Sequence, residues 1–196
     1  MALSDQFAEA LVFAARLHAK QVRKGAGIPY LSHLLGVASL VLEHGGDETE
    51  AIAGLLHDAI EDQACGYSGG ASGLRQAITD RYGEEVAVIV EACTDADTVP
   101  KPPWRARKEA YIAHLETAAP AVLRVSCADK LHNARTILVD LRTHGDALWQ
   151  RFQAGRDGTL WYYRALVEAF RAAGAPVTLV DELDRTVSLI EKKAHG

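Results

Sequence analysis

The sequence is poor in cysteine, and this scarcity excludes two common ways of stabilising a small protein. Its 196 residues include only three cysteines, Cys65, Cys93 and Cys127. Their number is odd, and their spacing matches neither a disulfide framework nor a CxxC metal-binding motif. We therefore expect free thiols in a reducing environment. An apolar core, which a chain of this length can bury, must then hold the fold together.

Long apolar runs and an excess of positive charge are also missing. No apolar stretch approaches the roughly 20 residues that a membrane-spanning helix needs, and no secretory leader is recognisable at the start of the chain. The formal net charge is −5, which disfavours a general affinity for nucleic acids or anionic membranes. These features predict a cytoplasmic protein whose partners are neither nucleic acid nor membrane.

The alternation of polar and apolar residues that marks a half-buried strand is scarce, whereas apolar residues recur at helical spacing almost throughout. Predicted helices cover about residues 4–22, 30–43, 47–62, 74–82, 84–93, 104–117, 121–143, 158–173 and 176–193. Cys65 to Gly73, with four glycines, and Val99 to Pro103, with three prolines, are predicted loops. The pattern indicates a single all-α domain over residues 1–196, with its C-terminal helices over about 157–195.

One segment carries more ionisable groups than an apolar helix should tolerate. Residues 54–62 read GLLHDAIED, with two adjacent polar pairs, His57-Asp58 and Glu61-Asp62. Burying a carboxylate is costly unless it is paired or binds a metal. On a continuous helix, residues four apart share a face, so His57 should lie beside Glu61, and Asp58 beside Asp62. The alternative is an exposed helix face with solvated carboxylates.

Two further predicted helices place polar groups in apolar surroundings. His33 lies in the helix over residues 30–43, and Asp129 lies in the middle of the helix over residues 121–143. On that later helix, Asn133 and Thr136 share a face with Asp129. Together with the pair at positions 57 and 58, these residues supply two imidazoles and two carboxylates. Such a mixed nitrogen and oxygen set suits Mn²⁺, Fe²⁺ or Zn²⁺ better than Ca²⁺.

Three blocks of the sequence resemble a known family. Residues 13–24, FAARLHAKQVRK, followed by Ile28-Pro-Tyr30, resemble the first block of the hydrolase domain of RelA/SpoT-type alarmone enzymes and their stand-alone small alarmone hydrolase relatives. Residues 53–62 resemble that family's HD-and-ED block, and residues 128–136, ADKLHNART, resemble its third block. The order His…His-Asp…Asp is that of the HD phosphohydrolase superfamily. The family usually has proline after its first metal-binding histidine, where this chain has Leu34.

The resemblance covers about residues 5–140 and implies a fold with a metal site. The fold would be a helical HD-domain bundle with a mononuclear metal site between its helices. The ligands implied are His33, His57, Asp58 and Asp129. They would hold one Mn²⁺ ion, or another divalent transition metal.

The same resemblance implies roles for six more residues. Glu61 and Asp62 would be the catalytic carboxylates, and either could serve as the general base. The basic pair Arg23 and Lys24 would contact the nucleotide, although a solvated basic turn is the competing interpretation. The remaining two residues, Asn133 and Thr136, would form hydrogen bonds to the base or ribose. A satisfied polar helix edge is the alternative for them.

The activity implied is hydrolysis of the 3′-pyrophosphate of guanosine tetra- or pentaphosphate, which releases pyrophosphate and GDP or GTP. The partner would therefore be a small guanosine nucleotide. One alternative is an HD phosphohydrolase that acts on another phosphorylated nucleotide, such as NADPH. Another is a module that binds the alarmone without cleaving it, although the intact pair Glu61 and Asp62 argues against this. The sequence makes no prediction of the oligomeric state.

Overall fold

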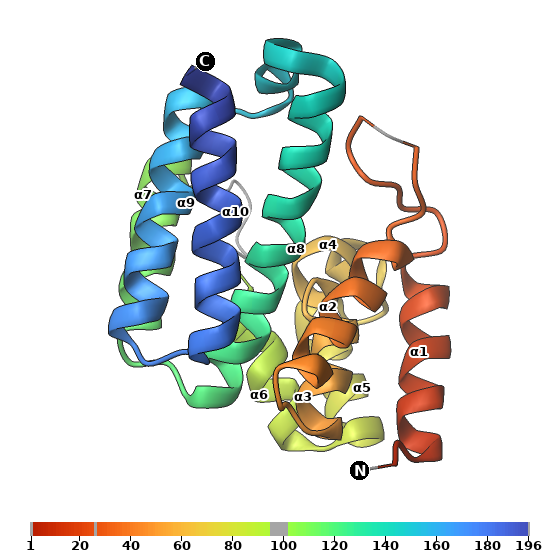
Figure 1. Ribbon diagram of the computed structural model, residues 1–196. Helices are drawn as coiled ribbons and strands as arrows, with labels where there is room; N and C mark the ends of the chain where they lie inside the picture. Colours follow the sequence, from red (N-terminus) through yellow and green to blue (C-terminus); the bar gives the residue numbers. More distant parts are fainter. Residues whose placement is uncertain (1, 26, 95–101, 196) are drawn as a thin grey trace. The chain divides into compact units, whose positions relative to one another are not determined.

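The computed structural model describes residues 2–25, 27–94 and 102–195, which are mostly helical (Figure 1). The chain divides into two compact units, Met1–Lys101 and Pro102–Gly196. Within the described ranges no strand forms, and the extended pairing consists of one isolated bridge between Val22 and Pro29. The predicted all-α fold is confirmed. That the whole chain is one domain stays a prediction.

The first unit is built around one short, buried helix. Its elements are α1 (Asp5–Leu17), α2 (Leu31–Glu43), α3 (Glu48–Leu56), α4 (Ala59–Gln63), the 3₁₀-helix η1 (Ala64–Gly66), α5 (Gly70–Tyr82) and α6 (Glu84–Cys93). Helix α3 packs against α1, α2 and α6. All its residues from Glu50 to Leu56 are buried, as expected for a helix that is covered on every side.

Two local features hold α3 in place. At its N-terminus, Asp47 accepts a hydrogen bond from the Glu50 backbone N–H, and the Glu50 carboxylate accepts one from the Asp47 N–H. This capping box satisfies two backbone donors that would otherwise lack helical partners. Towards its C-terminus, Gly54 lets α2 come close, because a Cβ there would lie 3.3 Å from the Ala38 Cα. The end of α3 is thereby held firmly against α2.

The predicted continuous helix over residues 47–62 is wrong, because the chain breaks between α3 and α4. Asp58 has φ −97° and ψ 2°, outside helical geometry. The Gly54 carbonyl, which would accept from the Asp58 N–H in an unbroken helix, lies 2.8 Å from Nδ1 of His57. This side chain competes with the helical hydrogen bond. The helix that was expected to carry His57 and Glu61 on one face is therefore interrupted, whereas Asp58 and Asp62 stay one turn apart, because the Asp62 N–H donates to the Asp58 carbonyl at 3.0 Å.

Two other boundaries in the first unit differ from the prediction. Helix α1 ends at Leu17 rather than near residue 22, and an extended segment follows, in which the Tyr30 N–H donates to the Gln21 carbonyl. Helix α5 begins at Gly70, inside the predicted glycine-rich loop. A Cβ on Gly73 would lie 2.2 Å from the Ser68 carbonyl oxygen. Glycine at this position therefore serves close backbone packing at the start of a helix.

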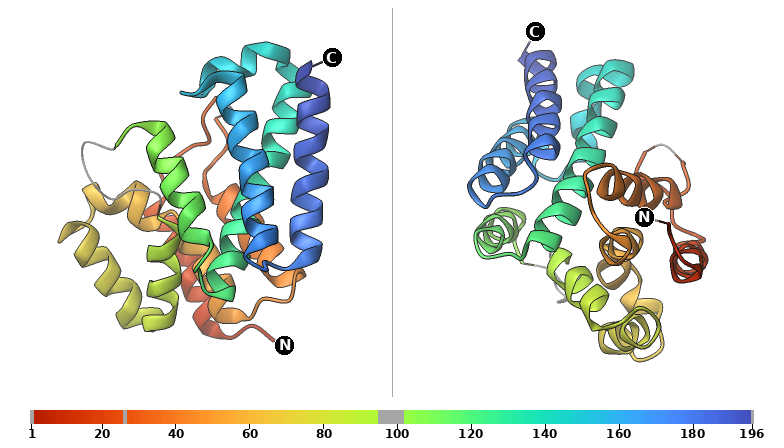
Figure 2. Two further views of the ribbon diagram at one scale, coloured as in Figure 1. Left: turned by 90° about the vertical axis from the view of Figure 1, so that its left-hand side faces the viewer. Right: turned by 60° about the horizontal axis from the view of Figure 1, so that its bottom comes forward.

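The second unit consists of α7 (Trp104–Leu115), α8 (Pro120–His144), the 3₁₀-helix η2 (Gly145–Arg151), α9 (Gly155–Ala172) and α10 (Val177–His195). Helix α10 packs against α8 and α9, and α7 packs against α9 (Figure 2). The sequence did not predict η2, and α9 begins three residues earlier than expected. Of the predicted loop at 99–103, residues 99–101 lie outside the described residues, and Pro102 and Pro103 precede α7 without helical structure.

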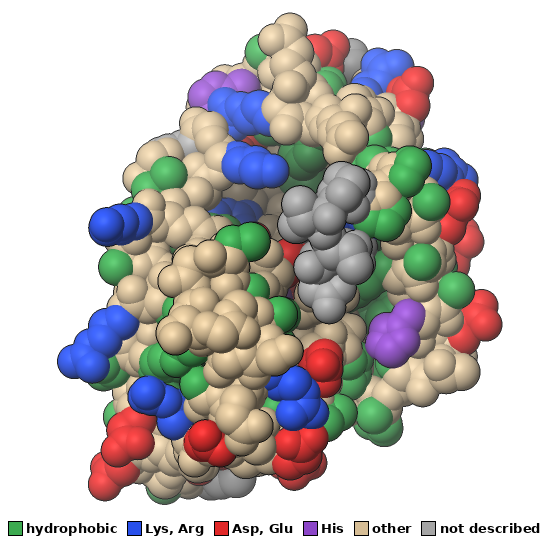
Figure 3. Space-filling view, turned by 180° about the vertical axis from the view of Figure 1, so that it is seen from behind, with side chains coloured by type: hydrophobic (Ala, Val, Ile, Leu, Met, Phe, Trp, Pro, Cys, Tyr) green, Lys and Arg blue, Asp and Glu red, His purple; other side chains and the backbone are tan. Residues whose placement is uncertain are grey.

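The outer surface carries charges of both signs. In the space-filling view, acidic and basic side chains are interspersed over the face shown (Figure 3), in keeping with a net charge of −5. Among the helices of the described part of the chain, none combines the length and apolar character needed to cross a membrane.

Candidate metal centre

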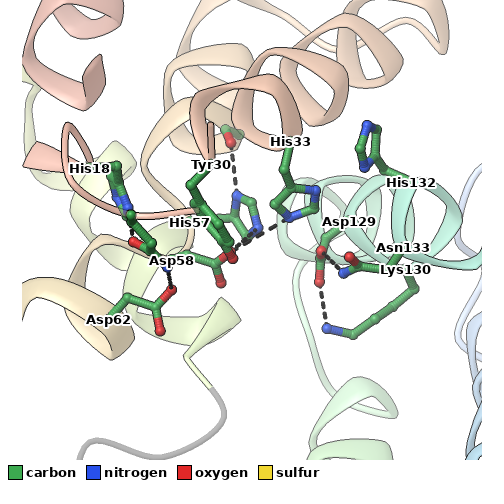
Figure 4. Close-up of polar contacts among 12 residues, drawn as sticks. His18, Tyr30, His33, His57, Asp58, Asp62, Asp129, Lys130, His132 and Asn133 are labelled. Carbon is green, nitrogen blue, oxygen red and sulfur yellow. Dashed lines mark hydrogen bonds and ion pairs between the residues drawn. The ribbon is translucent and has the colours of Figure 1, made fainter. Parts of the chain in front are cut away.

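The structure brings three of the four predicted metal ligands together in the first unit (Figure 4). His33 lies on α2, His57 follows the last residue of α3, and Asp58 precedes α4. One ligand atom of each lies within 4.8 Å of the others. Asp58 Oδ2 is 3.0 Å from Nε2 of His57 and 3.6 Å from Nε2 of His33. Both imidazoles are buried, whereas Asp58 is partly accessible.

The geometry of this cluster fits a divalent transition metal. Ligand atoms bound at about 2.1 Å to one ion lie roughly 3 Å or more apart, as the imidazole nitrogens and the Asp58 oxygen do. Because the His57 Nδ1 lies 2.8 Å from the Gly54 carbonyl, it must carry the hydrogen and donate it. The Nε2 lone pair therefore faces Asp58. A backbone carbonyl that fixes the tautomer is common for metal-binding histidines.

Tyr30 anchors the carboxylate of this cluster. Its hydroxyl donates to Oδ2 of Asp58 at 2.5 Å. Its ring meets the edge of the His33 ring, with 5.4 Å between centroids, and stacks on His18 at the same separation. No role was predicted for Tyr30 from the sequence. Its position three residues before His33, one turn away on a helix, was a signal that it could share the site.

Next to Asp58 along the chain, α4 carries the two predicted catalytic carboxylates. Asp62 Oδ2 accepts a hydrogen bond from Nε2 of Gln21 at 2.7 Å. Partial removal from water, and then the nearby Asp58 carboxylate, raise the pKa of Asp62, while the Gln21 hydrogen bond opposes this rise. The negative charge of Glu61 also contributes to the raised pKa. A carboxylate with increased proton affinity beside a candidate metal site is suited to accept a proton.

The predicted basic pair lies in the turn that follows Gln21. The Arg23 N–H donates to the Ile28 carbonyl at 2.8 Å, which closes this turn. The Arg23 guanidinium lies 5.8 Å from the centroid of the Tyr30 ring, and Lys24 is exposed. The Tyr30 side chain, whose hydroxyl donates to Asp58, therefore connects Arg23 with the Asp58 carboxylate. Leu34, which stands where the family usually has proline, is fully buried in α2.

In the second unit, the fourth predicted ligand is held by its own helix. Asp129 is buried on α8, and its two oxygens contact different residues. Oδ1 accepts from Nδ2 of Asn133 at 2.6 Å, and Oδ2 lies 2.5 Å from Nζ of Lys130. The structure thus pairs Asp129 with Asn133, as their shared face predicted. Thr136 donates instead to the His132 carbonyl of the same helix, at 3.1 Å.

Lys130 was not predicted from the sequence to take part in the site. Burial is the largest single influence and opposes its positive charge, but the Asp129 carboxylate together with Tyr111 and Tyr162 outweighs it, and the pKa of Lys130 is raised. The ammonium also lies 4.8 Å from the centroid of the Tyr111 ring. Lys130 therefore stays charged beside a carboxylate whose two oxygens are both oriented. Its place directly after Asp129 was a weak signal, because consecutive helical residues do not usually face each other.

Comparisons with known sequences agree with this picture. The family described as HD domain matches residues 10–160. A guanosine-3′,5′-bis(diphosphate) 3′-pyrophosphohydrolase MESH1 from Xenopus tropicalis is 36% identical over 132 residues, which are 66% of this chain and 68% of that protein. A probable GTP pyrophosphokinase from Mycobacterium leprae is 37% identical over 127 residues. These residues are 63% of this chain but only 15% of that much longer relative.

A solved structure is also similar. It is described as a metazoan ortholog of SpoT that hydrolyzes ppGpp and plays a role in starvation responses. The match has a TM-score of 0.77 and 26% sequence identity, and it covers 96% of this chain and 97% of that chain. Together, these similarities confirm the resemblance that three short sequence blocks indicated. All ten predicted site residues lie within the range that the family matches.

Proposed function

Because the chain belongs to the HD-domain family, we propose that it is a metal-dependent guanosine-3′,5′-bis(diphosphate) 3′-pyrophosphohydrolase. Water would attack the phosphorus attached to the 3′ oxygen, and the bond to that oxygen would break. The products would be pyrophosphate and GDP, or GTP from the pentaphosphate. The observation that supports this best is the convergence of His33, His57 and Asp58 within 4.8 Å, with Asp62 one helical turn further along the chain.

We propose that His33, His57, Asp58 and Asp129 hold one Mn²⁺ ion. Two imidazoles and two carboxylates are ligands that Mn²⁺ and its neighbours in the transition series accept. When bound, such an ion lowers the pKa of a coordinated water and polarises a phosphoryl oxygen. The chain itself orients the donors, since Tyr30 fixes Asp58 and the Gly54 carbonyl fixes His57.

The proposed role of Glu61 and Asp62 is to accept the proton of the attacking water. Asp62 is the better supported of the two, because its raised pKa increases its affinity for a proton. It is also accessible, so a substrate water can reach it. Glu61, its neighbour on α4, adds negative charge that favours protonation of Asp62.

Substrate binding is proposed for Arg23, Lys24, Asn133 and Thr136. Arg23 and the exposed Lys24 would offer positive charge to the phosphates, one as a planar fork and the other as a point charge. Asn133, which donates one amide hydrogen to Asp129, would form hydrogen bonds to the base or ribose. A free guanosine nucleotide as substrate agrees with the expected cytoplasmic location.

The test is to incubate the Mn²⁺-loaded protein with guanosine 3′,5′-bis(diphosphate) and to measure pyrophosphate and GDP. Release that stops on addition of EDTA supports the proposal. Glu61→Gln or Asp62→Asn should lower kcat by about 100-fold or more and leave nucleotide and metal binding intact. Unchanged turnover in both variants would refute the catalytic roles.

Two other results would each favour an alternative. Orthophosphate release from NADPH, with the alarmone left intact, would indicate a phosphohydrolase of different specificity. Tight binding of the alarmone without turnover of either nucleotide would indicate a sensor.

A further inference from the structure

Gln21 connects the segment after α1 to the carboxylate on α4. Its Nε2 donates to Asp62 at 2.7 Å. Its Oε1 accepts a hydrogen bond from Nε2 of Gln63 at 2.5 Å and lies 2.6 Å from Nδ1 of His18. One amide therefore contacts three side chains, two of which lie more than 40 residues further along the sequence.

These contacts allow the Gln21 amide only one orientation. The Nε2 of Gln63 can only donate, so the atom that it meets must be the oxygen of Gln21. Burial lowers the pKa of the His18 imidazole, and a neutral ring with its hydrogen on Nδ1 donates to the same oxygen. With two donors at Oε1, the NH₂ group must point to Asp62. An ionised carboxylate only accepts hydrogen bonds, so the arrangement is complementary.

The groups that orient Gln21 are themselves held in place. His18 is 2% exposed, and its ring is stacked on that of Tyr30, with an angle of 17° between the planes. The backbone of Gln21 accepts a hydrogen bond from the Tyr30 N–H at 2.9 Å. Tyr30 in turn donates to Asp58. The amide thus rests on the same residues that shape the candidate metal centre.

We infer that Gln21 is a positioning residue, which holds Oδ2 of Asp62 so that Oδ1 is presented to the attacking water. This inference rests on the proposed function, which gives Asp62 its catalytic role. Helix α4 has only five residues, and an exposed carboxylate on it would otherwise sample several rotamers. Because the hydrogen bond fixes a reacting group and does not bind substrate, its loss should lower kcat and leave KM unchanged.

The test is Gln21→Met, which keeps a long, unbranched side chain and removes the amide. We expect kcat for pyrophosphate release to fall about 10- to 100-fold, with KM and Mn²⁺ affinity changed by less than about twofold. The matched control is Gln76→Met on α5, which removes a Gln–Asp hydrogen bond of the same kind, 2.8 Å from Nε2 to Asp80. This control should keep wild-type kcat.

A double-variant comparison separates positioning from a general structural role. In an Asp62→Asn background, Gln21→Met should cause almost no further loss of kcat, because Gln21 acts only through Asp62. If the fold-losses of kcat caused by the two substitutions multiply in the double variant, the inference is overturned. A wild-type kcat for Gln21→Met would also overturn it. If Gln21→Met does not fold, Gln63→Met removes one of the two donors to Oε1 and should give a smaller loss of kcat. An unchanged kcat in that variant would then overturn the inference.

Crystal structures of the wild type and of Gln21→Met provide a readout that does not depend on activity. We expect Asp62 to contact Gln21 in the wild type and to adopt a different rotamer in the variant. If Asp62 moves but neither protein cleaves the alarmone, the positioning is supported and the proposed function fails. If Asp62 keeps its rotamer without the amide, the inference is wrong whatever the activity.

Discussion

At the scale of single residues, the candidate metal centre depends on one carboxylate oxygen. Oδ2 of Asp58 lies 2.5 Å from the Tyr30 hydroxyl, 3.0 Å from the His57 Nε2 and 3.6 Å from the His33 Nε2. A hydrogen bond to a ligand from outside the metal's coordination shell orients that ligand and tunes its charge. The Tyr30 hydroxyl therefore helps to hold these donor atoms together as one site.

Replacement of Tyr30 by phenylalanine tests this role. Tyr30→Phe keeps the ring that packs on His18 and His33 and removes only the hydroxyl. We expect Mn²⁺ affinity, measured by isothermal titration calorimetry, to fall about 10- to 100-fold. Tyr82→Phe is the control, because Tyr82 on α5 packs on Phe13 of α1. This variant should leave the Mn²⁺ affinity unchanged. Equal affinities for wild type and Tyr30→Phe would contradict the assignment.

At the scale of helices, the distance between α2 and α3 sets the position of His57. Gly54 faces the α2 backbone at Ala38, and its own carbonyl accepts the hydrogen of the His57 imidazole. A side chain at position 54 would have to displace backbone atoms, which cannot rotate aside as a flexible side chain can. The packing of α3 and the orientation of a proposed metal ligand are thus coupled at a single residue.

We predict that Gly54→Val lowers both stability and Mn²⁺ affinity. The larger side chain forces α2 and α3 apart, at a cost of about 1–3 kcal/mol in the free energy of unfolding. Urea denaturation and calorimetry measure the two effects. Gly66→Val is the comparison, because a Cβ at Gly66 meets no atom within 4 Å. Similar losses in the two variants would argue against a specific role for the α2–α3 contact.

Helices α9 and α10 of the second unit are joined by charged side chains. Arg164 on α9 lies 2.6 Å from both Asp184 and Glu191 of α10, and Arg171 lies 3.0 Å from Asp184. The hydrogen bond from Arg164 is the main cause that lowers the pKa of Asp184. Folding therefore favours the ionised form of this carboxylate, and its contribution to stability depends on pH.

The sign of this dependence follows from the lowered pKa. The stabilisation from Asp184 is complete above the ordinary carboxyl range and is lost as the pH falls through the lowered pKa of the folded state. Asp184→Asn should therefore cost about 1 kcal/mol at pH 7, and the difference from wild type should shrink towards zero in strong acid. Urea denaturation of the wild type and the variant, at pH 7 and in strong acid, measures this difference in the free energy of unfolding. A difference that persists in acid would contradict the ionic origin. Asp181→Asn, at a longer and more exposed contact with Arg171, should have a smaller effect.

At the scale of the whole molecule, the proposed ligand set draws on both units. Three of its members lie in Met1–Lys101, and Asp129 lies in Pro102–Gly196. The family match runs over residues 10–160 and so includes parts of both. If the four residues bind one ion, a change to any one of them should weaken its binding.

This leads to a prediction for Asp129→Asn. The substitution keeps the size of the side chain and removes its charge, so Mn²⁺ affinity should fall about 10-fold or more, as it should for Asp58→Asn. Calorimetric titration of each variant checks this expectation. The control is Asp140→Asn on the same helix, because Asp140 pairs with Arg151. The Mn²⁺ affinity of this variant should match that of the wild type. Wild-type affinity in Asp129→Asn would remove Asp129 from the ligand set.

The sequence by itself predicted the helical class and proposed four metal ligands, His33, His57, Asp58 and Asp129. Apolar spacing reports on neighbours within one or two turns of a helix, so the approximate positions of the long helices followed from it. His33, His57 and Asp58 stood out as candidates because an imidazole or carboxylate in an apolar helix is costly without a ligand or partner, and the resemblance implied their role as metal ligands. The order of three motifs then indicated the family.

The tertiary structure decided where the helices break and which distant side chains meet. The interruption at Asp58 depends on the competing contact between His57 and the Gly54 carbonyl. The hydrogen bond from Gln21 to Asp62 joins residues 41 positions apart. Periodicity describes only the face of a helix on which a residue lies. Contacts such as these depend instead on how α1, α3 and α4 pack, because packing brings together side chains that are remote in sequence.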